Sequence, residues 1–235
     1  MGDAEREDLA LGACTVLFGK DRGKYPEGNS LLVRGSDASL VIDPSLGVVA
    51  RREADPGAVP DIDHVVLSHC HEDHLAGAYL FPEATAHVHQ EDLVGWQSFE
   101  GFMQIYGFDD PDVAHVWETA LRDQFNYAER TDAKGYIDGD TWDLGGGVSV
   151  QAIHTPGHTR GHSALWIEPD EVLYLGDIDL SSFGPYYGDA WSDLEDFERS
   201  LARVRHIEAR HYATFHHIGV VDRAAFLERL DKFEA

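Results

Sequence analysis

The sequence predicts an α/β fold in which packed β-sheets are flanked by helices. Three features indicate this arrangement: short apolar segments typical of strands before residue 90, a helical segment at about residues 90–130, and a second group of strands followed by helices. The chain has 235 residues, of which 43% are hydrophobic, so a sizeable core can form. Because α/β folds of this length often remain undivided, we expect residues 1–235 to form a single domain.

The first strands are predicted from apolar, β-branched runs that polar residues and glycine interrupt. These runs occupy residues 13–19, 30–35, 38–45 and 63–68. Apolar residues at helical spacing then predict a helix over residues 72–81, which ends at Pro82. A further strand is expected at residues 84–90.

The segment at about residues 90–130 has apolar residues at helical intervals. Two helices are expected, over residues 90–107 and 111–130, and Pro111 suits the start of the second. The segment is rich in large aromatic residues: Trp96, Phe99, Phe102, Tyr106, Phe108, Trp117, Phe125 and Tyr127. We expect most of these rings to lie in the core.

The remaining elements return to strands and end with helices. Strands are expected at residues 147–154, 163–168, 171–179 and 212–216, and helices at residues 193–207 and 222–233. No run of 18 apolar residues could span a bilayer, and the acidic start lacks the basic and apolar segments of a signal peptide. We therefore expect a cytoplasmic protein without a membrane partner; the sequence leaves the oligomeric state open.

The charge balance is strongly acidic. Asp and Glu number 43 against 18 Lys and Arg, which gives a net charge of -25, and the acids are dispersed along the chain. Such a surface repels polyphosphates, so a nucleic-acid partner is disfavoured. The chain has 26 Asp but only 4 Lys, a composition typical of proteins adapted to high salt, where screening makes self-repulsion tolerable. We hypothesise a halophilic protein.

The two cysteines, Cys14 and Cys70, are too few for a disulfide framework or a four-cysteine zinc module. Cys70 lies within a histidine cluster, where it could serve as a nucleophile or a ligand. Because it alternates with His69 and His71, we expect its side chain to point the opposite way, into the core.

Chemistry is concentrated in the stretch HCHEDH, residues 69–74. Imidazole nitrogens and carboxylate oxygens are the ligands that zinc and iron take in hydrolytic and redox sites. In an extended stretch, His69 and His71 lie on the same side and can bind one ion together. If the chain turns helical after His71, Asp73 and His74 approach from another direction and can serve a second ion.

Further ligands are expected where later strands end. His158 lies in a Pro-Gly turn, and Asp177 follows an apolar strand and a glycine, where it could bridge two ions. The stretch YATFHHIG offers His216 or His217 after the next strand. Of these two histidines, His216 is preferred because it follows the strand immediately.

The order of these motifs resembles the metallo-β-lactamase fold superfamily, and its glyoxalase II-like branch in particular. HCHEDH matches the family's H-x-H-x-D-H signature, TPGHT, GD and the C-terminal histidine match its later ligands, and SLLVRGSDASLVIDPS resembles its opening hairpins. The resemblance covers about residues 14–220. It implies a four-layer αββα sandwich, here with a helical insert, and metals at one edge between the sheets.

The resemblance also implies a ligand set. By the family pattern, His69, His71 and His158 bind the first ion. The second is bound by Asp73, His74 and His216 (with His217 as the alternative), and Asp177 bridges the two. Asp43 would orient a ligand histidine, and we expect Asp179 and His162 to be supporting residues. The rings of Phe183, Tyr186 and Tyr187 could overhang the metals.

The expected function is that of a metal-dependent hydrolase. Two Zn²⁺ ions per chain (alternatively Fe or Mn, or a single Fe) would lower the pKa of a shared water and supply hydroxide. Asp73 and Asp177 are the predicted catalytic carboxylates, with Asp73 positioning the hydroxide. A small ester, thioester or lactone is the expected substrate, and no serine nucleophile motif is present.

Two other interpretations stay open. A mononuclear non-haem iron oxidoreductase of the persulfide-dioxygenase type would use His69, His158 and Asp177. A phosphodiesterase or nuclease is less favoured because of the acidic charge.

Overall fold

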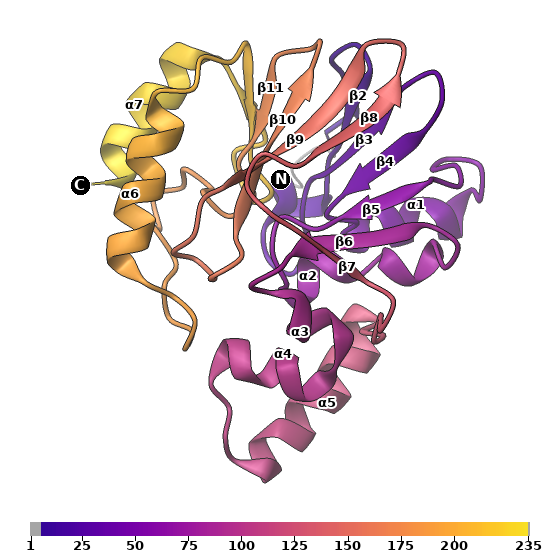
Figure 1. Ribbon diagram of the computed structural model, residues 1–235, viewed down its shortest axis with the longest axis vertical. Helices are drawn as coiled ribbons and strands as arrows, with labels where there is room; N and C mark the ends of the chain where they lie inside the picture. The colour runs from indigo at the N-terminus through magenta and orange to yellow at the C-terminus, as the bar shows by residue number, and fades with distance from the viewer. Residues whose placement is uncertain (1–5, 235) are drawn as a thin grey trace.

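Two β-sheets face each other in the computed structural model, which describes residues 6–234 (Figure 1). The first sheet has the order β1-β2-β3-β4-β5-β6-β7. Its strands are β1 (Leu9–Ala10), β2 (Cys14–Leu17), β3 (Ser30–Arg34), β4 (Ser39–Ile42), β5 (His64–Val66), β6 (Thr85–His89) and β7 (Lys134–Tyr136). Pairing is antiparallel from β1 to β4 and parallel from β4 to β7. The carboxyl ends of the parallel strands therefore meet at one edge.

The second sheet has the order β13-β12-β11-β10-β9-β8. Its strands are β8 (Thr141–Gly145), β9 (Val148–His154), β10 (Ser163–Glu168), β11 (Val172–Tyr174), β12 (His211–Ala213) and β13 (Val220–Val221). All neighbouring pairs are antiparallel except β11 and β12, which run parallel. As a result β9, β11 and β12 end at the same edge of this sheet.

Helices cover the outer faces of both sheets (Figure 1). Helix α1 (Leu46–Ala54) lies on the first sheet, and α6 (Leu194–Arg205) and α7 (Arg223–Phe233) lie on the second. Each begins at a side-chain cap, because Ser45, Asp193 and Asp222 accept hydrogen bonds from the backbone N–H two or three residues ahead.

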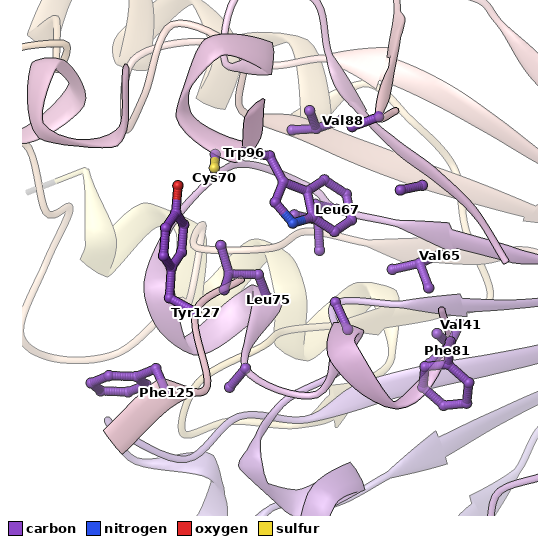
Figure 2. Packing of buried hydrophobic residues seen from close by; sticks show 14 of the residues in the cluster. Val41, Val65, Leu67, Cys70, Leu75, Phe81, Val88, Trp96, Phe125 and Tyr127 are labelled. Carbon is purple, nitrogen blue, oxygen red and sulfur yellow. The ribbon is translucent and has the colours of Figure 1, made fainter. Parts of the chain in front are cut away.

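Three apolar cores separate the four layers. The central core lies between the sheets and includes Val33 and Val150; a second lies behind the first sheet, and a third joins the second sheet to α6 and α7. Figure 2 shows the second core, where Cys70, Trp96 and Tyr127 lie close together. Cys70 thus points into the core, as expected. The predicted αββα sandwich is confirmed.

The predicted helical insert is present, but the first of its two expected helices, residues 90–107, is divided at Ser98, where the backbone is extended. The insert consists of α3 (Leu93–Gln97), α4 (Phe99–Tyr106) and α5 (Pro111–Phe125), and it extends from the β6 end of the sandwich (Figure 1). Pro111 occupies the first turn of α5, and Asp110 caps that turn. As expected, rings such as Trp96, Phe102 and Phe125 are buried.

The prediction of one continuous helix over residues 72–81 was wrong. The structure has α2 (Glu72–Leu75) and a 3-10 turn, η2 (Ala78–Leu80), separated at Gly77. The N–H of Gly77 donates to the carbonyl of Pro44 at 2.6 Å, outside the helical pattern. This contact needs glycine, because a Cβ would lie 2.9 Å from that carbonyl oxygen.

Helix α1 and strands β1, β7, β8 and β13 were not predicted from the sequence, and a 3-10 segment, η1 (Lys20–Gly23), follows β2. Among residues 6–234, no helix combines the length and the apolar character that crossing a membrane would require.

Candidate metal centre

The HCHEDH turn follows β5 at the edge where the strands of both sheets end. Its residues change from extended to helical at His71, which caps α2 with φ -110° and ψ 159°. His69 and His71 therefore precede the helix, whereas Asp73 and His74 lie on its first turn, as predicted. The loops after β9, β11 and β12 bring His158, Asp177 and His216 to the same place.

The first ligand group consists of His69, His71 and His158, all buried. Their inward nitrogens form a nearly equilateral triangle: Nε2 of His69 lies 3.1 Å from Nδ1 of His71, and Nε2 of His158 lies 3.1 Å from each. Nitrogen ligands about 2.0–2.1 Å from a tetrahedral zinc ion are about 3.3 Å apart. The triangle therefore has the size of one face of such a site.

Hydrogen bonds on the outward nitrogens set the tautomers in this group. Nδ1 of His158 donates to the carbonyl of Tyr186 at 2.9 Å, and Nδ1 of His69 lies 3.0 Å from Oγ of Ser68, which donates its own proton elsewhere. With the proton on Nδ1, the Nε2 atoms of His69 and His158 present lone pairs to each other. A cation between them would remove that repulsion.

The second ligand group consists of Asp73, His74 and His216. Nε2 of His216 lies 3.1 Å from Oδ2 of Asp73, and Nε2 of His74 lies 3.8 Å from Oδ1. The outward nitrogens again have acceptors: Nδ1 of His216 donates to the carbonyl of Gly23 at 2.7 Å, and Nδ1 of His74 donates to Asp43 at 2.9 Å.

Asp177 lies between the two groups. Its Oδ1 is 3.1 Å from Nε2 of His74, and its Oδ2 is 3.3 Å from Nε2 of His158 and 3.8 Å from Nε2 of His216. One carboxylate thus faces both groups, which is the position that a bridging ligand would need.

The donor set fits divalent cations. Among the residues that the structure describes, Oδ2 of Asp73, Nε2 of His74 and Oδ1 of Asp177 are buried without an aligned hydrogen-bond partner. Buried polar atoms normally have partners, and these three point toward the second group's centre. Imidazole nitrogens and carboxylate oxygens in this arrangement suit zinc, iron or manganese.

The pKa values of the predicted ligands also favour a bound cation. Burial lowers the pKa of His69 well below its ordinary value, with neighbouring imidazoles adding to the effect. Burial also acts on His74 and His216, but the carboxylates of Asp177 and Asp73 outweigh it, raising the pKa of His74 well above its usual value and that of His216 to about 9. The carboxylates therefore stabilise positive charge here, which a bound cation would supply.

Asp43 supports the signature turn, as expected from the sequence. It has a left-handed backbone (φ 47°) and no exposed surface. Its carboxylate accepts hydrogen bonds from the backbone N–H and the hydroxyl of Ser68, from Nδ1 of His74 and from the hydroxyl of Tyr174. Four donors on one buried carboxylate fix the orientation of His74.

His162 supports the loop of Asp177, as expected. Its ring is fully buried, Nδ1 donates to the carbonyl of Thr155 at 2.9 Å, and Nε2 accepts from the backbone N–H of Asp177 at 3.1 Å. Burial lowers its pKa to about 3, so it stays neutral. Asp179 is likewise used locally, accepting from the N–H of Ser181.

Two supporting carboxylates were missed by the sequence analysis. Asp92 is fully buried and accepts from the N–H of Cys70 (3.1 Å), the hydroxyl of Thr159 (2.7 Å) and the N–H of Gly161 (2.7 Å), so it joins the loops of His69 and His158. The sequence places it 18 or more residues from either loop, and nothing local marks it.

The second is Asp189, in the segment of residues 181–193. Its Oδ2 lies 3.3 Å from Nε2 of His71, an ion-pair distance, and its side chain is only 6% exposed. The same segment carries the Tyr186 carbonyl that binds His158, and the Tyr186 ring lies 5.8 Å from the His158 ring. Tyr186 therefore overhangs the site, whereas Phe183 is 76% exposed.

The insert contacts the site through Glu72. This buried carboxylate accepts hydrogen bonds from the hydroxyls of Tyr25 (2.9 Å) and Tyr106. The ring of Tyr106 also lies over that of His71, with centroids 5.0 Å apart. One insert ring, that of Tyr106, thus reaches a predicted ligand.

His217 lies apart from these groups. Within the described residues, the sets whose ligand atoms lie within 4.8 Å of one another are His69–His71–His158, His69–His74–Asp177 and Asp73–His74–His216. His217 belongs to none of them and has a left-handed backbone, φ 55°. Of the two candidate histidines, the structure brings His216 into the cluster.

Comparisons with known proteins identify the family and the fold. The family model of the metallo-beta-lactamase superfamily matches residues 26–215. The chain is 28% identical over 218 residues to the acyl-coenzyme A thioesterase MBLAC2 of Homo sapiens, covering 81% of this chain and 76% of that protein. It is 26% identical over 189 residues to the N-acyl homoserine lactonase AttM of Rhizobium radiobacter, covering 74% of this chain and 64% of the lactonase.

A similar fold is found among solved structures. The metallo-beta-lactamase family protein TTHA1429 from Thermus thermophilus superimposes with a TM-score of 0.67, at 22% identity, over 96% of this chain and 79% of that one. At this identity the likeness concerns the fold.

Proposed function

The chain belongs to the metallo-beta-lactamase superfamily, and on that premise we propose that it hydrolyses a small acyl thioester at a centre of two metal ions. Hydrolase activity is the common feature of the thioesterase and lactonase relatives. The thioester is preferred because the thioesterase match covers more of both proteins. The proposed ligands are His69, His71 and His158 for one ion, and Asp73, His74 and His216 for the other, with Asp177 shared.

The main support for two metal ions is the position of Asp177. Its two carboxylate oxygens face different ligand groups, at 3.1 Å from His74 and 3.3 Å from His158. A single-ion site would need only one of these contacts. The proposed single-iron alternative, which uses His69, His158 and Asp177, leaves Asp73 and His216 without a role.

Bound metals would polarise the thioester carbonyl and supply hydroxide at neutral pH. The residues of the chain arrange that chemistry. With Oδ2 of Asp73 facing the second ligand group, its other oxygen, Oδ1, would accept the proton of the attacking water and pass it to the leaving thiolate. Asp43 and Asp92 keep the ligand loops in place, so the site needs little rearrangement when substrate binds.

Other parts of the chain shape the approach to the site. The rings of Tyr106 and Tyr186 lie beside His71 and His158, respectively, and form an aromatic wall. Such a wall can contact an acyl group and exclude water from it. A lactone would fit the same chemistry, and the lactonase relative makes it the second candidate.

Metal analysis and a substrate panel test the proposal together. The purified protein should contain about two metal ions per chain and hydrolyse acyl thioesters faster than lactones or phosphodiesters of similar size. Asp177→Ala should lower kcat by at least about 100-fold, since a shared ligand supports both ions. The matched control Asp179→Ala should keep its metal content.

Three results would overturn the proposal. One iron per chain with oxygen uptake would indicate the dioxygenase alternative. Activity on phosphodiesters alone would indicate the nuclease branch. Unchanged turnover in Asp177→Ala would show that Asp177 is not shared between two ions.

A further inference from the structure

Tyr25 lies in the loop that holds His216. The carbonyl oxygens two residues before and two residues after it, those of Gly23 and Glu27, lie 2.7 Å and 3.1 Å from Nδ1 of His216. The loop therefore covers the outward nitrogen of this predicted ligand, and Tyr25 is its middle residue. Unlike the ligand, Tyr25 is 50% exposed.

The side chain of Tyr25 extends from this loop to the HCHEDH turn. Its hydroxyl donates a hydrogen bond of 2.9 Å to Oε1 of Glu72, the residue between the predicted ligands His71 and Asp73. Burial, and then the carboxylates of Glu72 and Asp73, raise the pKa of Tyr25 above its ordinary value. Tyr25 thus joins the loop of His216 to the turn of Asp73, and half of its surface is open to solvent. A substrate that approaches the second ligand group therefore meets Tyr25.

The contact with Glu72 fixes the proton of the Tyr25 hydroxyl. The hydroxyl of Tyr106 donates to the other carboxylate oxygen, Oε2, so each tyrosine has an oxygen of its own. A phenol has one proton, and because Tyr25 gives it to a buried carboxylate, its oxygen offers only lone pairs to a ligand. A hydroxyl that donates to a carboxylate is also a stronger acceptor, because linked hydrogen bonds polarise one another.

Tyr25 is the more accessible of the two tyrosines. The ring of Tyr106 packs among those of Phe102, Phe108 and Trp117, with centroids 5.3, 5.7 and 5.9 Å away. Tyr106 is only partly exposed, whereas Tyr25 is among the exposed large side chains. The acceptor that a ligand can reach is therefore the oxygen of Tyr25.

We propose that the hydroxyl oxygen of Tyr25 accepts a hydrogen bond from an amide N–H in the thiol part of the substrate. The inference rests on the proposed thioester hydrolysis and adds which thiols the site prefers. The rings of Tyr106 and Tyr186 beside the first ligand group suit the acyl group, which leaves the thiol part for the side of His216. A lone-pair acceptor on that side stabilises a thiol with an N–H donor near its sulfur and gives nothing to a hydrocarbon thiol of the same length. The preferred substrates are therefore thioesters of amide-bearing thiols.

The kinetic test compares two thioesters of one acyl group, the N-acetylcysteamine ester and the S-pentyl ester, in which methylenes replace the amide. The ratio of their kcat/KM values should fall about five- to tenfold in Tyr25→Phe, mainly through the KM of the amide ester, since this is the scale of one neutral hydrogen bond. Because both esters are measured on the same preparation, any loss of folded or metal-loaded protein cancels in the ratio.

Tyr79→Phe is the matched control. It removes the same hydroxyl from a 42% exposed position on η2 and should keep the wild-type ratio. An unchanged ratio in Tyr25→Phe, or an equal fall in both variants, would overturn the inference.

A binding test separates this inference from the proposed function. The S-ethyl thioether of N-acetylcysteamine cannot be hydrolysed, and its Kd for the metal-loaded protein can be measured by NMR titration. It should bind Tyr25→Phe about five- to tenfold more weakly than the wild type or Tyr79→Phe. Equal binding to all three proteins would show that Tyr25 does not recognise the amide. If neither thioester is hydrolysed, the proposed function fails, and the titration alone decides the role of Tyr25.

Discussion

The hydroxyl of Thr159 donates a hydrogen bond of 2.7 Å to the carboxylate of Asp92. The same carboxylate accepts from the backbone of Cys70, so one buried side chain links the loops that carry two of the predicted ligands, His69 and His158. The strands that precede these two loops belong to different sheets, so no strand pairing joins them. Asp92 therefore links them, together with the backbone N–H of Ser163, which donates to the carbonyl of Ser68 at 2.9 Å.

Asp92→Asn should destabilise this link. An amide NH₂ in place of one carboxylate oxygen would face a donor, and a lost buried hydrogen bond of this kind costs about 1–3 kcal/mol in the free energy of unfolding. Urea unfolding should show that loss, and elemental analysis should show a lower metal content. Asp123→Asn, on the exposed face of α5, serves as the control. Full metal content in Asp92→Asn would contradict the positioning role.

Asp189→Ala should weaken metal binding at the first ligand group. The carboxylate lies 3.3 Å from the outer nitrogen of His71, and losing such a partner typically lowers metal affinity by about 10–100-fold. Competition with a chromophoric chelator measures this directly. Asp61→Ala removes the same charge from a 94% exposed position and should have no effect. Equal affinities in both variants would show that Asp189 does not orient His71.

Acid should destabilise the fold through buried neutral histidines. Burial lowers the pKa of His87 to about 4, with His64 and Lys134 adding to the shift. Because the unfolded chain takes up the proton near pH 6.5 and the folded chain only near pH 4, stability is complete above about pH 6.5 and falls as the pH drops toward 4.

His87→Gln tests that linkage. The variant cannot ionise at this position, so its free energy of unfolding should fall less between pH 7 and pH 5 than that of the wild type. Circular dichroism during urea unfolding at both pH values gives the difference. The exposed His115→Gln should behave as the wild type. An unchanged pH dependence in His87→Gln would exclude this histidine as a source of acid sensitivity.

Salt should stabilise the protein. With a net charge of -25, self-repulsion is strong at low ionic strength, and the Debye length shortens from about 10 Å at 0.1 M to about 3 Å at 1 M. The melting temperature should therefore rise between 0.1 M and 2 M KCl, with metal content held constant. A melting temperature independent of KCl would argue against adaptation to high salt.

The predicted ligands could be identified from the sequence because each lies in a short pattern of neighbouring residues. The HCHEDH turn places four candidates within six residues, and His158, Asp177 and His216 each follow an apolar strand. The strand-to-loop transition marks such residues without knowledge of the tertiary fold. The sandwich and the helical insert followed from periodicity in the same way.

What the sequence did not reveal depends on contacts between distant segments. Asp92 and Asp189 resemble many other acids in the chain until the fold brings Cys70 or His71 beside them. The break at Gly77 comes from the close approach of Pro44, 33 positions earlier. Helix α1 was not predicted because Gly47, Val48 and Val49 have low helix propensity. The helix forms because these residues pack on the first sheet.

The proposed ligands come from both halves of the sandwich. His69, His71, Asp73 and His74 follow a strand of the first sheet, whereas His158, Asp177 and His216 follow strands of the second. Ions held by both would act as a cross-link that closes only after the two halves have met. Removal of the ions by a chelator should then weaken the interface between the two sheets before either sheet unfolds. Metal binding would likewise be the last step of folding.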